Sequence, residues 1–116
     1  MAEISMPQLQ VLIADGRILW TEHVAIRLRG RGIKRADVIK CIETGEIIEQ
    51  YADDVPFPSC LVSGKCRDGK PLHIVIGLKV SEVCCMITAY RPDTDKWEGD
   101  FKTRKKGEKN NGLFSL

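Results

Sequence analysis

The sequence predicts an α+β fold in which short N-terminal helices pack on a C-terminal antiparallel β-sheet. Up to residue 44, apolar residues recur at helical spacing. From residue 46 onward, short apolar stretches with alternating polarity indicate strands. The pair Asp68-Gly69, a strong hairpin signal, separates two of these stretches. Helices followed by strands favour two layers, with the helices on one face of the sheet.

The three expected helices are marked by their ends. The first follows Pro7 through LQVLIA and stops at Gly16. Thr21 is a suitable N-cap for the second, which runs through EHVAIRLR. The third runs through RADVIKCIET and stops at Gly45. Its start is poorly marked, because Lys34 stands where a Ser or Asp would cap the helix.

The expected strands cover residues 46–51, 59–66, 71–80 and 82–90, with a loop, DDVPFP, after the first. Side chains alternate between the two faces of a strand. In residues 71–80 this places Leu72, Ile74, Ile76 and Leu78 on one face and His73, Val75 and Gly77 on the other. In the last strand it places Cys84, Met86, Thr88 and Tyr90 on one face and Val83, Cys85, Ile87 and Ala89 on the other.

Length and composition set the domain organisation. A chain of 116 residues predicts a single domain, 1–116, with a core of about residues 7–102 and a basic, flexible tail at 103–116. No apolar run approaches the ~20 residues of a membrane span, and the first ten residues lack signal-peptide features. We therefore expect a cytoplasmic protein. The five cysteines should be reduced, and adjacent Cys84 and Cys85 point to opposite strand faces, so neither a metal site nor a cofactor is expected.

Charge is unevenly distributed along the chain. Residues 27–40 hold six basic residues and one acid, whereas residues 43–54 hold five acids and no basic residue. The sequence KTRKKGEK, from residue 102, is basic again. Two basic segments could form a site for a polyanion such as RNA. Solvated helix faces and a basic tail are the alternative.

Two groups of residues are candidates for chemistry. His23, Arg27 and Arg31 recur every four residues and form one stripe on the second helix. His73, Thr88 and Tyr90 form a His/hydroxyl/phenol group if their strands present them on one face, with His73 partly exposed. Transfer of a ribose phosphate needs a proton acceptor and cations, which these groups could supply from a common cleft. Structural ion pairs and a half-polar sheet face are the alternatives.

Further basic and aromatic residues could bind RNA. The phosphate contacts would come from Arg31, Arg91, Lys102, Arg104 and Lys105. Tyr90 or Trp97 could stack on a base. The sequence has no phosphate-binding loop and no serine-hydrolase elbow, which excludes the common nucleotide-binding and hydrolase motifs.

Several blocks of the sequence together resemble a known family. They are TEHVAIRLRGRGI, GEIIEQY, PFPSCLVSG, PLHIVI and ITAYRP, followed by Trp97. They are similar to a bacterial and archaeal family of unknown function placed near the BrnT-like toxins of the RelE/ParE superfamily. The resemblance covers roughly Trp20 to Lys105. It implies an mRNA-cleaving toxin fold and a cognate antitoxin, often a small zinc-finger protein encoded beside it.

One departure from the BrnT-like pattern affects the expected site. Tyr90 stands where those toxins have an arginine, so a phosphate-binding cation would come from Arg91, Arg27 or the tail. The leading hypothesis is a metal-independent, toxin-type endoribonuclease. His23 or His73 would be its acid or base, Arg27 and Arg31 its phosphate stabilisers, and Thr88 and Tyr90 its orienting groups. The alternatives are a non-catalytic RNA- or protein-binding module of the same fold, and a structural homodimer formed through a strand edge.

Overall fold

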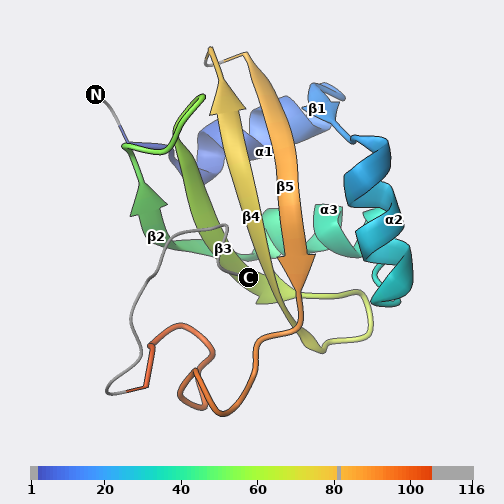
Figure 1. Cartoon of the computed structure of the whole chain (residues 1–116), viewed down its shortest axis with the longest axis vertical. Coiled ribbons are helices and arrows are strands. Elements are labelled where there is room, and N and C mark those ends of the chain that lie inside the picture. The colour runs from blue at the N-terminus through green and yellow to red at the C-terminus, as the bar shows by residue number, and fades with distance from the viewer. Residues whose placement is uncertain (1–2, 81, 106–116) are drawn as a thin grey trace.

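The computed structural model, which describes residues 3–80 and 82–105, contains three helices and one five-stranded sheet. The elements are α1 (Met6–Ala14), β1 (Ile18–Leu19), α2 (Glu22–Gly30), α3 (Arg35–Thr44), β2 (Glu46–Tyr51), β3 (Ser59–Lys65), β4 (Pro71–Lys79) and β5 (Val83–Tyr90). Figure 1 shows the long strands side by side with the helices behind and beside them. The predicted α+β class is confirmed.

The sheet is mixed, with the order β1-β5-β4-β3-β2. Neighbours among β2 to β5 are antiparallel, but β1 pairs with β5 in parallel through Ile18 and Cys84. The prediction of a purely antiparallel sheet is therefore wrong at this edge. The apolar pair Ile18-Leu19 follows the turn after α1 and reaches the start of β5, which gives it a strand partner far along the chain.

The helices start where local hydrogen bonds satisfy their first N–H groups. The Thr21 hydroxyl accepts a hydrogen bond from the Val24 N–H at 3.1 Å, which confirms the predicted cap of α2. At α3 the Lys34 N–H donates to an Asp37 carboxylate oxygen at 3.1 Å. Lys34 has no short polar side chain of the usual capping type, and the Asp37 carboxylate, three residues later, instead forms the side-chain hydrogen bond at the start of α3.

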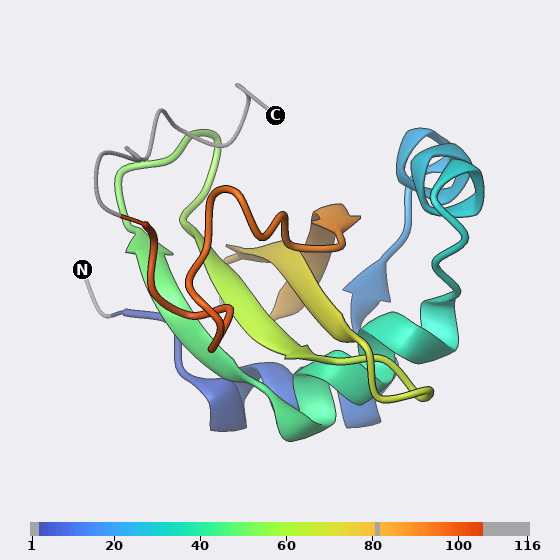
Figure 2. The ribbon, with the colours of Figure 1, turned by 90° about the horizontal axis from the view of Figure 1, so that it is seen from below.

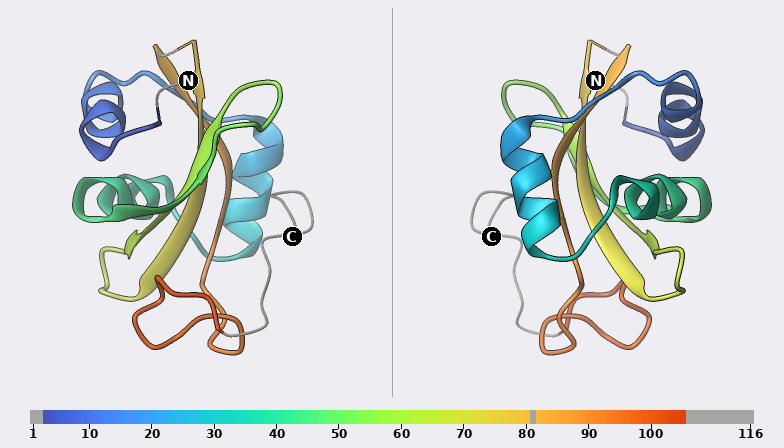
Figure 3. Two further views of the ribbon diagram at one scale, coloured as in Figure 1. Left: turned by 90° about the vertical axis from the view of Figure 1, so that its left-hand side faces the viewer. Right: turned by 90° about the vertical axis from the view of Figure 1, so that its right-hand side faces the viewer.

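The main core lies between the sheet and helices α1 and α3, and Val24 and Leu28 of α2 also belong to it. It joins helix residues such as Leu9, Leu12, Val38 and Ile42 to strand residues such as Ile74 and Ile76. Figure 3 shows α1 and α3 on one side of the sheet and α2 at the edge formed by β5. The alternation predicted for residues 71–80 is confirmed, because Leu72, Ile74, Ile76 and Leu78 all belong to this core while Val75 packs on the opposite face.

The alternation predicted for the last strand is wrong in its second half. Val75 pairs with Thr88, but the next residue, Ile76, pairs with Met86, so Ile87 has no partner of its own. This β-bulge changes which face the following side chains occupy. Cys84, Met86 and Ala89 therefore join the main core, whereas Ile87 and Tyr90 lie in a second cluster on the other face.

The second cluster is covered by the C-terminal segment, which we define as residues 91–105. Leu61, Val75 and Trp97 form its buried centre, and Tyr51 and Phe101 pack around them. Figure 2 shows this segment on the side of the sheet away from α1 and α3. Trp97 and Arg104 form an isolated β-bridge, so residues 103–105 take part in the fold although the sequence assigns them to the tail. Residues 106–116 of that tail lie outside the described residues.

Candidate functional site

His73 and Tyr90 form a hydrogen-bonded pair on the face under the C-terminal segment. They are directly opposite each other in β4 and β5. The Nδ1 atom of His73 lies 3.3 Å from the Tyr90 hydroxyl, and its Nε2 atom lies 2.6 Å from the Phe101 carbonyl oxygen. A carbonyl only accepts, so Nε2 carries the proton and Nδ1 accepts from Tyr90. The predicted meeting of His73 and Tyr90 on one face is confirmed.

The prediction that His73 is partly exposed is wrong. Its side chain is 0% exposed, because the C-terminal segment lies over it. The Trp97 ring packs edge-on at 4.6 Å between ring centroids. Burial lowers the pKa of His73, since the charged form would lose its hydration, although the hydrogen bond to Phe101 opposes this shift. The buried His73 side chain therefore favours its neutral form and does not reach the surface.

An ion pair beside His73 connects the C-terminal segment to β2. Arg104 donates to both carboxylate oxygens of Glu49, at 2.6 and 3.0 Å, and its guanidinium lies 4.6 Å from the centre of the Trp97 ring. The Tyr51 hydroxyl also donates to Glu49. Burial acts to raise the Glu49 pKa, but the hydrogen bonds from Arg104 and Tyr51 outweigh it and the net shift is downward. Burial raises the pKa of Tyr90 to about 12, so its phenol stays protonated.

The sequence analysis missed Glu49 and Tyr51 as members of this cluster. They are two residues apart in β2 and therefore share a strand face, which is the signal that could have found them. Their partner Arg104 is 55 residues away in sequence, and no local pattern connects the two. All members of the cluster have hydrogen-bond partners, which is the arrangement of a structural polar network.

Thr88 does not join His73 and Tyr90. Its hydroxyl accepts a hydrogen bond from Arg31 at 3.2 Å, and the same Arg31 nitrogen donates to the Ala89 carbonyl at 2.6 Å. Arg31 thus ties the end of α2 to β5 beyond the two residues of β5 that pair with β1. Its guanidinium satisfies a strand carbonyl that has no neighbouring strand.

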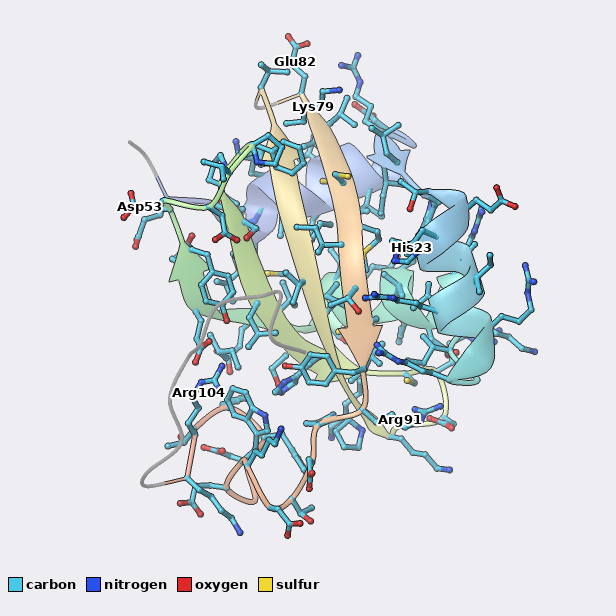
Figure 4. All side chains as sticks on the ribbon, in the orientation of Figure 1. His23, Asp53, Lys79, Glu82, Arg91 and Arg104 are labelled. Atoms are coloured by element: carbon cyan, nitrogen blue, oxygen red, sulfur yellow. The ribbon has the colours of Figure 1, made fainter. Side chains whose placement is uncertain are left out.

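His23 and Arg27 are exposed on α2, and Figure 4 shows His23 on the side of that helix turned toward β5. Among residues 3–80 and 82–105, no hydrogen bond or ion pair joins either residue to His73, Thr88 or Tyr90. The structure therefore does not assemble the predicted composite site, and the catalytic roles of these residues stay predictions.

The cations expected to bind RNA differ in their surroundings. Lys102 pairs with Glu46, and Arg104 with Glu49. Lys105 donates its backbone N–H to the Lys96 carbonyl at 2.9 Å. Arg91 is exposed, and its guanidinium donates to the Gly32 carbonyl at 3.4 Å, which places it at the junction of α2 and α3.

A basic pocket of about 390 Å³ occupies that junction. It is lined by Ala25, Leu28, Arg29, Gly32, Ile33, Lys34 and Arg35. In the described part of the chain, no carboxylate forms an ion pair with its three cations. The Arg35 guanidinium also lies 5.0 Å from the centre of the Trp20 ring. The pocket combines unpaired positive charge with apolar surface.

Within residues 3–80 and 82–105, no three His, Cys, Asp or Glu side chains gather as metal ligands would. No helix in the same residues has the length and hydropathy to cross a bilayer.

The three helices and the mixed five-stranded sheet define a small α+β domain. Residues 20–91 match the family described as Domain of unknown function (DUF4258), and the chain belongs to that family. Comparison with curated proteins gives no match, and comparison with solved structures also gives none. The family match spans α2 to β5 and hence the basic pocket and the His73–Tyr90 pair. It carries no link to BrnT-like or RelE-like toxins.

Proposed function

We propose that this domain binds single-stranded RNA through the basic pocket between α2 and α3. The observation that supports this most is the gathering of Arg29, Lys34 and Arg35 around one pocket with no carboxylate paired to them in the described residues. Arg91 adds a fourth cation at the pocket edge through Gly32. Phosphates supply most of the affinity of such complexes, so unpaired cations in one place are the primary requirement.

The surfaces beside the cations suit a single strand. Leu28 and Ile33 contribute apolar walls, and Arg29 and Arg35 contribute guanidinium groups. Proteins that bind single strands combine a positively charged groove with aromatic or guanidinium surfaces on which bases stack. By contrast, Lys102 and Arg104 pair with glutamates and are poorly placed to hold phosphates.

Binding is measured by fluorescence anisotropy with a labelled 20-nucleotide RNA at several salt concentrations. The variant Lys34→Glu/Arg35→Glu should weaken binding about tenfold or more and should lower the salt slope by about 1.4, since each lost phosphate contact removes ~0.7 for single strands. Lys70→Glu, an exposed cation in the β3–β4 turn, is the matched control and should bind normally. Equal losses in both variants, or no RNA binding by the parent protein, would reject the proposal.

A second candidate is the toxin-type, metal-independent endoribonuclease, and one observation favours it. His23 is exposed one helical turn before Arg27, so a base and a cation lie at the surface of the helix that borders the pocket. In this reading His23 accepts the 2′-hydroxyl proton, Arg27 stabilises the phosphorane, and a cognate antitoxin, a small zinc-finger protein, blocks this helix.

Cleavage is tested by incubating the protein with the same RNA in EDTA and analysing the products. The endoribonuclease should leave 2′,3′-cyclic phosphate ends, and His23→Ala should slow it by about 10²-fold or more while the RNA still binds. His73→Ala is the contrasting variant: it should change stability and leave the cleavage rate of the folded protein unaltered. If the RNA stays intact after incubation with the parent protein, the endoribonuclease candidate is rejected and only the RNA-binding function remains.

A further inference from the structure

A groove of about 1020 Å³ lies between the β2–β3 loop and the β4–β5 turn. We name it the Val55–Val80 groove after the residues on its two banks. Figure 4 labels Asp53 on the loop and Lys79 at the end of β4, at the opposite end of the sheet from Arg91 and Arg104. The groove is therefore separate from the basic pocket, and a molecule bound in it would leave that pocket open.

Both banks of the groove expose a large apolar side chain. Val55 is 77% exposed and Val80 is 78% exposed, more than any other large apolar side chain in the described residues. Single exposed apolar residues are ordinary on protein surfaces. Val55 and Val80 line the same groove together with Phe57 and Leu78, and these four side chains give it apolar surface of the kind that marks interaction sites.

The backbone at Val80 adds an independent indication. Its φ is +48°, in the left-handed region, where a β-branched residue is a rare outlier. Glycine or asparagine would fit this turn position without strain. Valine at this position costs stability through its backbone conformation and exposes an apolar side chain to water. Neither the stability of the fold nor solvation therefore explains why residue 80 is a valine. Strained positions of this type cluster at binding sites.

The opposite bank is held in place by the loop around it. Phe57 packs directly over Gly77, where a Cβ atom would lie 2.3 Å from the Phe57 ring. The Ser59 hydroxyl donates to Asp54 at 2.7 Å, and the Leu78 N–H donates to the Pro58 carbonyl at 3.0 Å. These contacts fix the loop on both sides while Val55 points outward. A partner would meet a surface that is already ordered, which reduces the entropy lost on binding.

The charges at the groove select the partner. Glu3, Asp53 and Asp54 line it against a single cation, Lys79. No ion pair neutralises these carboxylates within residues 3–80 and 82–105. An RNA phosphate would be repelled, whereas Lys or Arg side chains would be attracted. We propose that the Val55–Val80 groove docks a short protein segment in which apolar side chains alternate with lysine or arginine.

The test uses defined peptides and the full chain. The probe is a fluorescein-labelled eight-residue peptide that alternates leucine and lysine, and its binding is followed by anisotropy and by amide shifts in ¹⁵N spectra. Matched peptides replace lysine by glutamate, which reverses the charge, or leucine by serine, which removes the apolar side chains. Only the leucine-lysine peptide should bind, with shifts at the non-proline residues of 53–57 and at residues 78–80, and with affinity that falls as salt rises.

Val80→Asn separates binding from folding. Asparagine tolerates the left-handed backbone, so the variant should melt at the same temperature or higher, yet bind the peptide about tenfold more weakly because one valine is no longer buried. Asp53→Lys should also weaken binding. Val11→Asn, which changes a 60%-exposed valine on α1, is the matched control and should bind normally.

Three results would overturn the proposal. The first is absence of binding, or equal binding of the leucine-glutamate peptide. The second is a set of shifts at α2 and α3 instead of the groove. The third is self-association of the parent protein, seen by light scattering, that Val80→Asn abolishes, since the occupant would then be a second copy of the chain.

Discussion

Replacing Glu49 by Gln, Arg104 by Gln, and both together measures how strongly the C-terminal segment is tied to β2. The two side chains are 21% and 24% exposed and share two charge-assisted hydrogen bonds, at 2.6 and 3.0 Å. Hydrogen bonds to charged groups contribute about 1.5–3 kcal/mol when buried. Partial exposure reduces this value, so we expect a coupling energy of about 1–2 kcal/mol.

The coupling is obtained from urea unfolding of the four proteins, as the difference between the double variant and the sum of the single ones. The chain offers a matched control in Glu46 and Lys102, which join the same strand to the same segment with side chains 53% and 51% exposed. That pair should show no measurable coupling, because water screens it. Equal couplings for the two pairs, or none for Glu49 and Arg104, would refute the reasoning from burial.

Three other predictions concern stability. Burial lowers the pKa of His73 below its ordinary value near 6.5, so below that pH the unfolded chain takes up a proton that the folded chain does not. Unfolding free energy should therefore fall as pH drops below about 6.5, and His73→Gln should flatten this part of a pH series of urea melts. Gly77→Ala should lower the melting temperature, because the new Cβ would collide with Phe57, whereas Gly69→Ala, with no atom within 4 Å, should act only through its positive φ and cost less. Thr21→Ala should cost about 1 kcal/mol by removing the cap of α2, and Thr94→Ala, at an exposed threonine whose hydroxyl makes no hydrogen bond in the described residues, should serve as the comparison in the same thermal melts.

The strand alternation of β4 was predictable because it depends only on a two-residue period. Leu72 to Leu78 carry that period, and it correctly placed His73 opposite the main core. In β5 the same reasoning failed after Met86, since a bulge at Ile87 changes the phase and nothing in the residues VCCMITAY marks it.

The burial of His73 could not be read from its own strand. Its exposure depends on Trp97 and Phe101, which reach it from a segment with two aromatic residues among many charged ones. Local patterns cannot tell whether such a segment folds back on the sheet. The same holds for Arg31, whose hydrogen bonds to β5 span 57 and 58 residues. The sequence analysis thus identified the residue types and missed their long-range partners.

The contact between Arg31 and the Ala89 carbonyl has a consequence for how copies of this domain can associate. With β1 paired to the start of β5 and α2 held beside its second half by Arg31, an incoming strand could not pair with β5 along its length. At the other end of the sheet no further strand lies beside β2 in the described residues, and a bulge between Ile47 and Glu49 breaks the regular spacing of its ladder. The two flanks therefore differ in what they present to a neighbouring copy: β1 and α2 lie beside β5, whereas β2 presents an irregular strand edge.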